Sequence, residues 1–397
     1  MKQFKTIDDF NFSGKRVLLR ADLNVPIQDD VITDTTRIAR TIPTILELQE
    51  KGAQVIVMSH FGRPKGPQCP EMSLKPIAAE LGRYLNQVVI FSHDCIGQEA
   101  MEMISAADRG SVIMLENLRF HSEEEANDEN FAKQISDLAD IYVNNAFSCA
   151  HRAHASTAAI TRFLPSAAGR LMQYELEALN NALGNPAPPV AALVGGAKIS
   201  SKIEVLVNLV SKVDQLIIGG GMANTFLHSK GINIGKSLCE TDMIEQAQSI
   251  MKNAMVADCE IVLPIDAVVA PKLEIGIKTA VVPINLVPPD HMILDVGPHS
   301  IKDLVKRLET YQTIVWNGPL GAFEVMPFDK GTNAVAREAA RLTRKGDLLS
   351  VAGGGDTIAA LANAGVIDNF SYISTAGGAF LEWLEGKTLP GIAALND

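Results

Sequence analysis

The chain alternates short apolar, β-branched runs with helical stretches, and this alternation constrains its fold more than any other feature. Amphipathic segments such as 74–85 and 129–139 predict helices between the apolar runs. Strands that alternate with helices form parallel sheets covered by helices on both faces. The first half is therefore predicted to be a doubly wound α/β domain, with strands at 16–24, 54–60, 87–93, 111–118 and 141–147.

The second half repeats the pattern after a long helix. Residues 171–184 place Met172, Leu176, Leu179 and Leu183 on one helical face, and Gly184 with the prolines that follow it ends the helix. At 397 residues the chain is long enough for two domains. We expect two doubly wound parallel-sheet (Rossmann-like) domains joined by a helix and hinge, the second with strands at 189–195, 215–220, 260–266, 313–318, 347–353 and 370–377.

Charge and cysteine content exclude several classes of protein. A net charge of −11 argues against nucleic acid or an anionic membrane as the main partner. The five cysteines are scattered and form no CxxC pair, which favours reduced thiols over a disulfide framework or a zinc site. The N-terminal residues have no apolar signal region, so we expect a cytoplasmic protein. The acidic segment 121–129 is predicted to be a solvated connection.

Polar residues follow successive strands of the first half. Such residues meet at the carboxyl edge of a parallel sheet, where ligands bind. Arginine recognises phosphate and carboxylate in bidentate fashion and keeps its charge in a partly dry cleft. Taken singly, each arginine could be a surface charge, and His60, His151 and His154 could be structural. Their shared position after strands favours an anion-binding edge that contains Asp22, Leu23, Asn24, Arg37, His60, Phe61, Gly62, Arg63, Arg119 and Arg152.

Glycine-rich turns follow the strands of the second half. In the segment Gly353–Thr357, three glycines precede a helix, where backbone N–H groups can approach an anion. Asp356 could cap that helix or bind a metal, and the segment alone could be a plain tight turn. Lys198 and Lys202 follow Gly195-Gly196, although the spacing is not that of a P-loop. Together with the turns at 219–221, 316–324 and 377–378, these residues predict a polyphosphate site.

No motif for a covalent nucleophile is present: the chain has neither G-x-S-x-G nor H-E-x-x-H. Two complementary anion sites favour direct transfer between two bound ligands. Phosphoryl transfer fits, because it needs positioning, charge neutralisation and exclusion of water more than covalent chemistry.

Eight segments resemble the phosphoglycerate kinase family over nearly the whole chain. They are RADLNVP (20–26), SHFGRP (59–64), LENLRF (115–120), NNAFSCAHRAHAS (144–156), GGAKISSKI (195–203), WNGPLGAFE (316–324), GGGDT (353–357) and LEGKTLPGIAAL (384–395). The resemblance implies reversible phosphoryl transfer from 1,3-bisphosphoglycerate to MgADP, giving 3-phosphoglycerate and MgATP in glycolysis. It also implies a monomer that closes by hinge bending. The N-terminal domain, 1–171 with the tail from about 378 to 397, would bind phosphoglycerate, and 172–377 would bind nucleotide.

The resemblance also assigns roles to single residues. The ten residues of the anion-binding edge would bind phosphoglycerate. Arg37, Lys198, Gly354 and Gly377 would stabilise the charge of the transferring group. The nucleotide would be held by Lys202, Asn317, Glu324, Gly353, Gly354, Gly355, Asp356 and Thr357, with Asp356 also binding Mg²⁺.

One position departs from the family pattern. Three glycines are expected after Ser374-Thr375, and the chain has Ala376-Gly377-Gly378. Alanine resists a positive φ, so the loop is undisturbed only if residue 376 has ordinary dihedrals. We expect activity to be retained. Two alternatives stay open at this point: a non-catalytic nucleotide or metabolite sensor on the same scaffold, and a dinucleotide oxidoreductase, which the absence of G-x-G-x-x-G disfavours.

Overall fold

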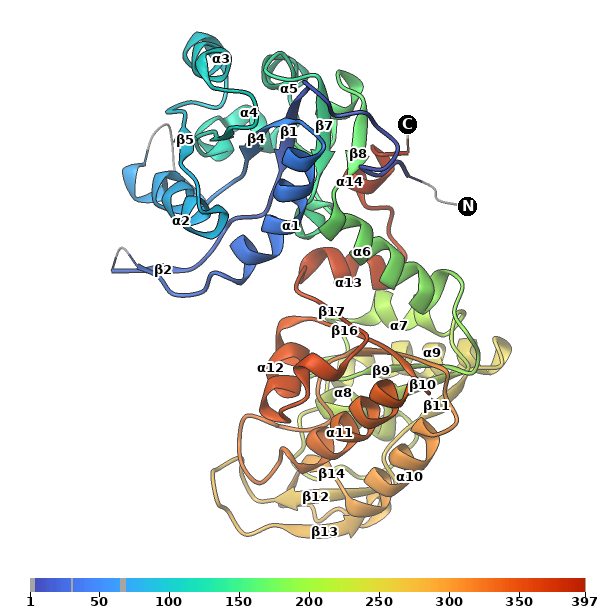
Figure 1. Ribbon diagram of the computed structural model, residues 1–397. Helices are drawn as coiled ribbons and strands as arrows, with labels where there is room; N and C mark the ends of the chain where they lie inside the picture. Colours follow the sequence, from blue (N-terminus) through green and yellow to red (C-terminus); the bar gives the residue numbers. More distant parts are fainter. Residues whose placement is uncertain (1–3, 30, 65–68, 397) are drawn as a thin grey trace. The chain divides into compact units, whose positions relative to one another are not determined.

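The computed structural model describes residues 4–29, 31–64 and 69–396. The chain forms two compact units (Figure 1). The first comprises Met1–Leu176 and Thr388–Asp397, and the second comprises Glu177–Lys387. Helix α6 (Arg170–Leu179) and the π-helical turn η5 (Asn180–Gly184) carry the chain from the first unit into the second, as the amphipathic pattern predicts.

A six-stranded parallel sheet forms the centre of the first unit, in the order β5-β6-β4-β1-β7-β8. Strand β1 pairs with β4 on one side and with β7 on the other, so that Arg20 lies between Met58 and Asn144. The strands are β1 (Arg16–Arg20), β4 (Gln54–Met58), β5 (Val89–Phe91), β6 (Val112–Met114), β7 (Ile141–Asn144) and β8 (Ser166–Ala168).

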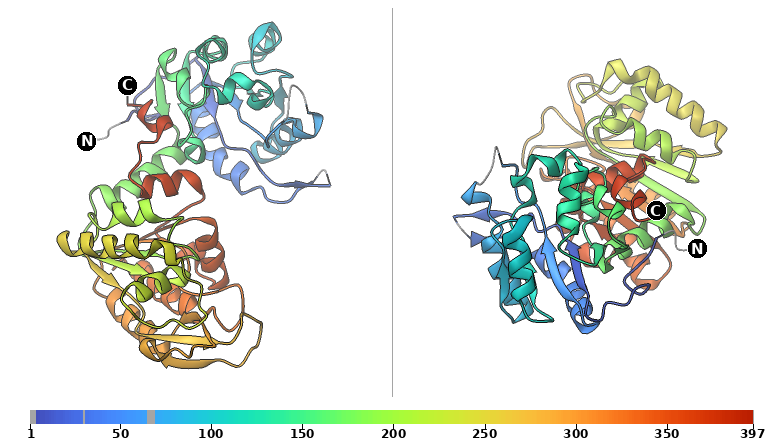
Figure 2. Two further views of the ribbon diagram at one scale, coloured as in Figure 1. Left: turned by 180° about the vertical axis from the view of Figure 1, so that it is seen from behind. Right: turned by 90° about the horizontal axis from the view of Figure 1, so that it is seen from above.

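Helices flank this sheet on both faces (Figures 1 and 2). They are α1 (Thr36–Glu50), α2 (Lys75–Leu85), α3 (Gly97–Ala106), α4 (Ser122–Glu125), α5 (Glu129–Ser136) and the C-terminal α14 (Pro390–Ala393). Side chains of α1 and α2, including Leu48 and Ile77, pack with Val17 and Val57 of the sheet in one buried cluster. A short hairpin, β2 (Ile27–Gln28) with β3 (Val31–Ile32), precedes α1.

The prediction of a solvated loop at 121–129 is wrong. The segment forms α4 and the start of α5, and the side chain of Glu124 is completely buried. Its carboxylate accepts hydrogen bonds from the backbone N–H and the hydroxyl of Ser156, at 2.9 and 2.6 Å. These bonds replace the water that a buried carboxylate loses. Acidic composition alone does not reveal such a partner.

The second unit has its own six-stranded parallel sheet, in the order β11-β10-β9-β15-β16-β17. Helices α7, α8 and α9 pack with one another on one face, and α10, α11 and α12 on the other. The strands are β9 (Val190–Val194), β10 (Gln215–Ile218), β11 (Glu260–Val262), β15 (Thr313–Asn317), β16 (Leu349–Gly353) and β17 (Tyr372–Ser374). The helices are α7 (Ile203–Leu209), α8 (Gly220–Ser229), α9 (Ile244–Val256), α10 (Pro298–Leu308), α11 (Lys330–Lys345), α12 (Gly355–Asn363) and α13 (Gly378–Leu384).

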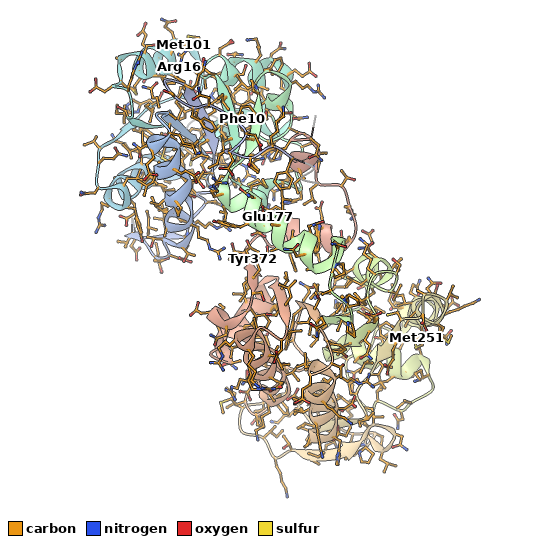
Figure 3. All side chains as sticks on the ribbon, turned by 45° about the vertical axis from the view of Figure 1, so that its right-hand side comes forward. Phe10, Arg16, Met101, Glu177, Met251 and Tyr372 are labelled. Carbon is orange, nitrogen blue, oxygen red and sulfur yellow. The ribbon has the colours of Figure 1, made fainter. Side chains whose placement is uncertain are left out.

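A second, antiparallel sheet in this unit has no counterpart among the predicted strands. Its order is β13-β12-β14, with β12 at Asp266–Ala270, β13 at Ala280–Pro283 and β14 at Met292–Val296. Strand β13 is largely exposed, so it lacks the buried apolar run that identifies a central parallel strand. The predicted doubly wound fold is otherwise confirmed, and side chains fill the space between each sheet and its helices (Figure 3). Within the described residues, no helix combines the length and apolar character that crossing a bilayer requires.

Candidate active site

The anion-binding edge of the first unit lies where β1 and β7 end side by side. The chain order of the sheet reverses at β1, which makes this the switch point where doubly wound sheets bind ligands. Asp22 follows β1, and its carboxylate accepts a hydrogen bond from Ser148, which follows β7. Arg37 in the first turn of α1 donates to the same carboxylate at 2.5 Å. The loops after these two strands are therefore joined through Asp22.

A second connection joins the loops after β1, β4 and β6. The Asn24 side-chain oxygen accepts from the backbone N–H of Gly62 at 3.0 Å, and Arg119 Nη1 donates to the carbonyl of Gly62 at 2.6 Å. The Arg119 Nε lies 3.0 Å from Glu125 Oε1, without hydrogen-bond alignment. Burial, followed by the neighbouring Arg152 and Arg20, lowers the pKa of Arg119. Positive charge is thus concentrated at this edge.

His60 lies among the arginine side chains of this edge. Its side chain is 6% exposed. Burial and the charges of Arg20, Arg119, Arg152 and Arg37 hold the pKa of His60 well below its ordinary value. The imidazole is accordingly neutral near pH 7.

The remaining predicted residues of this unit flank the same loops. The backbone N–H of Leu23 donates to Ser59, and that of Phe61 donates to Asn117. Arg152, after the turn η3 (Phe147–Cys149), donates from Nε to His151. The side chain of Arg63 is exposed. The side chains of Leu23 and Phe61 are buried, so the structure gives these side chains a packing role.

The glycine-rich edge of the second unit also lies at a switch point, between β9 and β15. Lys202 spans it: its Nζ donates to the carbonyls of Gly195 and Asn317 at 2.8 and 2.9 Å and to the Asn317 side-chain oxygen at 2.6 Å. All three ammonium donors therefore have protein acceptors. Burial lowers the pKa of Lys202 to about 8, and the nearby Asp356 opposes this shift.

The Gly353–Thr357 turn is fixed by side chains from the neighbouring strand end. Asn317 Nδ2 donates to the carbonyl of Gly353 at 2.7 Å, and Thr357 Oγ1 donates to the same carbonyl at 2.8 Å. Gly354 has φ 98°, and a Cβ there would lie 2.8 Å from Asn317 Nδ2, so this position requires glycine. Gly354 precedes α12, and no side chain caps that helix. Its first N–H groups remain available to an anion.

A cavity of about 300 Å³ adjoins this turn. Glu324 and Asp356, both exposed, contribute carboxylates to its lining. Sequence reasoning named these two residues but missed the apolar wall, formed by Leu227, Leu238, Met292, Leu294 and Leu320. Two of the wall residues come from β14, a strand that the sequence pattern did not reveal. A cavity with an apolar wall and a phosphate-binding edge suits a nucleotide.

Lys198, Ala376 and Gly377 complete the predicted set. Lys198 is exposed in the loop after β9. Gly377 precedes α13 with φ 51°. Ala376 is absent from the described non-glycine residues with positive φ, which are Asp29, Asn86, Asn127 and Asp258. The alanine therefore sits in this loop without backbone strain.

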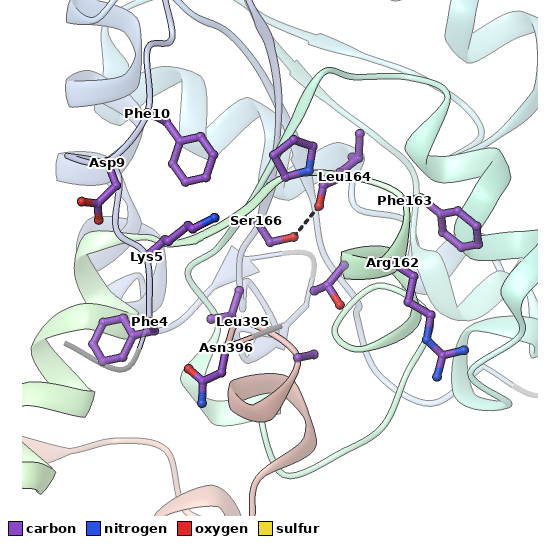
Figure 4. Close-up of a pocket in the computed structure, with 13 residues that line it drawn as sticks. Phe4, Lys5, Asp9, Phe10, Arg162, Phe163, Leu164, Ser166, Leu395 and Asn396 are labelled. Carbon is purple, nitrogen blue, oxygen red and sulfur yellow. Dashed lines mark hydrogen bonds between the residues drawn. The ribbon is translucent and has the colours of Figure 1, made fainter. Parts of the chain in front are cut away.

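Another cavity, of about 770 Å³, lies in the first unit between the N-terminal segment, the loop before β8 and the C-terminal residues (Figure 4). Phe4, Phe10, Phe163 and Leu395 are among the residues that line it. None of its lining residues is a predicted site residue. All five cysteines are free, as expected.

Comparison with known proteins gives one consistent result. A family model described as phosphoglycerate kinase matches residues 7–387. The chain is 58% identical over 397 residues to a phosphoglycerate kinase of Chelativorans sp. (strain BNC1), covering 100% of both chains. It is 57% identical over 397 residues to that of Agrobacterium fabrum, covering 100% of this chain and 99% of the relative.

Solved structures agree. The phosphoglycerate kinase from Coxiella burnetii superposes with a TM-score of 0.93 at 43% identity, covering 99% of this chain and 98% of the other. That from Pyrococcus horikoshii OT3 gives a TM-score of 0.79 at 32% identity, covering 98% of each chain.

Proposed function

The chain belongs to the phosphoglycerate kinase family and is a phosphotransferase of glycolysis; from this premise we propose how its residues divide the work. The first unit binds phosphoglycerate and the second binds ADP or ATP. The observation that carries the proposal is the cationic edge around a neutral His60, at a switch point of the first sheet. The alternative of a non-catalytic binding protein has no support among the relatives.

Phosphoglycerate is an anion with a carboxyl group at one end and a phosphate at the other. Arginines bind both groups through paired donors. We assign this role to Arg63, Arg119 and Arg152, which follow β4, β6 and β7, and to Arg37, which lies in the first turn of α1 and bonds to Asp22. Asp22 and Asn24 line the site as acceptors for the substrate's single hydroxyl, while the backbone of Leu23, Phe61 and Gly62 shapes the edge. Arg37 also neutralises charge on the transferring group.

The nucleotide occupies the 300 Å³ cavity of the second unit. Its base and sugar lie against the apolar wall and Glu324, and its phosphates reach the N-terminus of α12 at Gly353–Thr357. Lys202 and Asn317 hold this edge in shape, and Lys202 supplies positive charge. Lys198 is the exposed cation that reaches the transferring phosphoryl group. Backbone N–H groups at Gly354 and Gly377 donate to the charge that develops on it.

The residues at this edge fit a magnesium ion. Asp356 is an exposed carboxylate beside the cavity, and carboxylate oxygen is a hard ligand of the kind that Mg²⁺ prefers. Bound as MgADP or MgATP, the ion supplies charge neutralisation between phosphate oxygens. Asp356 holds it in place.

Transfer is direct and in line, after hinge closure has brought the two ligands together and excluded water. We propose that the protein acts as a cytoplasmic monomer with small-molecule substrates only, and with neither nucleic acid nor membrane as a partner. The net charge of −11 supports the last point.

A coupled assay tests the function. Purified protein is expected to convert 3-phosphoglycerate and MgATP into 1,3-bisphosphoglycerate and MgADP, and the rate should fall when Mg²⁺ is removed with a chelator. Folded protein that binds nucleotide without turnover would instead favour the sensor alternative.

A further inference from the structure

A buried hydrogen-bonded chain links the acidic helix α4 to His60. Glu124 accepts from the Ser156 hydroxyl at 2.6 Å, and the same hydroxyl accepts from Arg20 Nε at 2.9 Å. Arg20 Nη2 then lies 3.1 Å from His60 Nδ1. Glu124, Ser156 and Arg20 are each no more than 1% exposed. The four residues come from four separate segments of the sequence, so this series of hydrogen bonds forms only in the folded unit.

The burial of the charged side chains of Arg20 and Glu124 costs free energy, and this cost requires an explanation. Arg20 and Glu124 are both removed from water, and Ser156 stands between them. Burying an ion pair costs about as much as its attraction returns, so such a pair is weak evidence for a role in stability alone. Arg20 further donates to the carbonyl of Ala21 and lies near Cys149. Its planar guanidinium is therefore held on both edges, in one orientation.

That orientation determines the protonation of His60. A guanidinium has donors and no acceptors, so the ring nitrogen facing it must be the acceptor. Nδ1 of His60 is consequently unprotonated, and the proton of the neutral ring is on Nε2. Without Arg20 the two tautomers could exchange. A ring with its proton on Nε2 offers one donor to an anionic ligand.

The surroundings of His60 keep the ring neutral. The charged and titratable groups that act on it come from every neighbouring loop: Arg20, Arg37, Arg119, Arg152, Asp22 and Cys149. Four are cations, and the Asp22 carboxylate is already bonded to Arg37. Protonation of His60 would add a further positive charge beside these four arginines and is therefore disfavoured.

We propose that Glu124 and Ser156 are positioning residues for phosphoglycerate binding: they orient Arg20, and Arg20 fixes His60 in the tautomer that donates from Nε2. The inference rests on the proposed function only for the ligand that receives this hydrogen bond. The hydrogen bonds from Glu124 through Ser156 and Arg20 to His60, which we call the relay, are present in the protein without ligand. The relay gives a role to Glu124, the buried acidic residue that the sequence pattern predicted to be solvent-exposed.

Nuclear magnetic resonance on the full chain tests the relay. Two-bond ¹H–¹⁵N correlations of ¹⁵N-histidine-labelled protein distinguish the two tautomers and the imidazolium, with His60→Gln used to assign the signal. The expected pattern is Nε2–H, unchanged from pH 6 to pH 8. A protonated Nδ1, or an imidazolium at pH 7, would overturn the proposal in the wild-type protein, so the test does not depend on any variant folding.

A variant adds the functional consequence. Ser156→Ala breaks the link between Glu124 and Arg20, so the His60 tautomers should mix. The KM for 3-phosphoglycerate should rise roughly tenfold, on the scale of one hydrogen bond, while the KM for MgATP stays unchanged. The matched control is Ser92→Ala, which removes another buried hydroxyl of the same unit, bonded to the carbonyl of Asp94.

The outcomes separate the two claims. If Ser156→Ala keeps both the tautomer and the KM of the wild type, the positioning role is wrong. If the wild-type protein shows the Nε2–H pattern but no turnover of 3-phosphoglycerate, the relay stands and the proposed function fails.

Discussion

The side chains of Lys202 and Asn317 form one hydrogen-bonded unit, with 2.6 Å between Nζ and Oδ1. The lysine also binds the carbonyls at the ends of β9 and β15, and the asparagine binds the carbonyl at the end of β16. Three adjacent strand ends are thereby tied together at the glycine-rich edge of the second unit. The preorganisation of this edge depends on two side chains that come from distant parts of the sequence.

Replacing Asn317 with alanine should loosen this edge. The change removes both Asn317 side-chain bonds at a position only 5% exposed, leaving Gly353 and Lys202 each short of a partner. We expect MgADP affinity to fall about tenfold and the free energy of unfolding to fall by about 1–3 kcal/mol. Calorimetry and denaturant titration measure the two effects. Asn253→Ala, on the exposed face of α9, is the control, and equal affinities in the two variants would refute the role of Asn317.

Replacing Arg37 with alanine should impair catalysis. The variant loses the guanidinium that bonds Asp22 and, in our proposal, neutralises the transferring group. Turnover should fall roughly 10²-fold or more, the scale of one preorganised charge contact. Steady-state kinetics measure the loss, with Arg83→Ala on the exposed side of α2 as the control. Near-normal rates in the Arg37 variant would remove its assigned role.

Lys198 should act on turnover more than on binding. Because its side chain is exposed and the cavity lining does not include it, Lys198→Ala should leave MgADP affinity within about twofold. The kcat should fall roughly 10²-fold. Comparing kcat with the dissociation constant separates the two quantities, and Lys212→Ala supplies an exposed lysine control in the same unit. A variant that only binds nucleotide more weakly would contradict a role in transfer.

Nucleotide affinity should depend on pH through Lys202. Burial lowers the pKa of Lys202 to about 8, so the ammonium is charged below that pH and loses its charge as the pH rises through it. An anion binds best to the charged form, so MgADP affinity should be constant from pH 6 to pH 7.5 and decline above about pH 8. The Lys202→Met variant should bind MgADP more weakly, and its affinity should not decline above about pH 8. A decline of equal size in the methionine variant would assign the titration to another group.

Ala376 should be close to neutral for function. Because this alanine does not have a positive φ, restoring glycine relieves no strain. Ala376→Gly should lower the free energy of unfolding by about 0.5–1 kcal/mol through greater freedom of the unfolded chain. Its kcat should stay within about twofold of the wild type. A large gain in kcat would show that the alanine displaces the Gly377 loop.

The two parallel sheets were predictable because each central strand is a short apolar run followed by a helix. The same logic placed Asp22, Arg37, His60 and Arg119 at one edge, since strand ends of a parallel sheet converge. The antiparallel strands β12–β14 were missed because they follow one another with no α-helix between them, so they do not fit the strand–helix alternation that identified the other strands. Strand β13 is also largely exposed, which interrupts its apolar pattern. Part of the apolar wall of the 300 Å³ cavity, which comes from β14, was missed with them.

Two other features depend on contacts that no local pattern encodes. Glu124 lies in a run of acidic residues whose composition suggests a solvated segment, and its hydrogen bonds from Ser156, 32 residues further along, replace the water that it loses on burial. Lys202 reads as a phosphate ligand from its glycine-rich surroundings, yet its three acceptors are protein oxygens. In both cases, the environment of the side chain is set by hydrogen-bond partners that are distant in the sequence.

The glycine contact between the ends of β9 and β15 limits how this protein could be altered. Gly318 has φ 112°, and a Cβ there would collide with the backbone of Gly195, so the backbones of the two loops are in direct contact. A side chain at position 318 would push the two loops apart and disturb the hydrogen bonds from Lys202 to the carbonyls of Gly195 and Asn317. In the binding mode that we propose, a version that accepts a bulkier nucleotide base must therefore be sought among the replaceable side chains of the far wall, such as Leu238 and Met292, and not at this glycine contact.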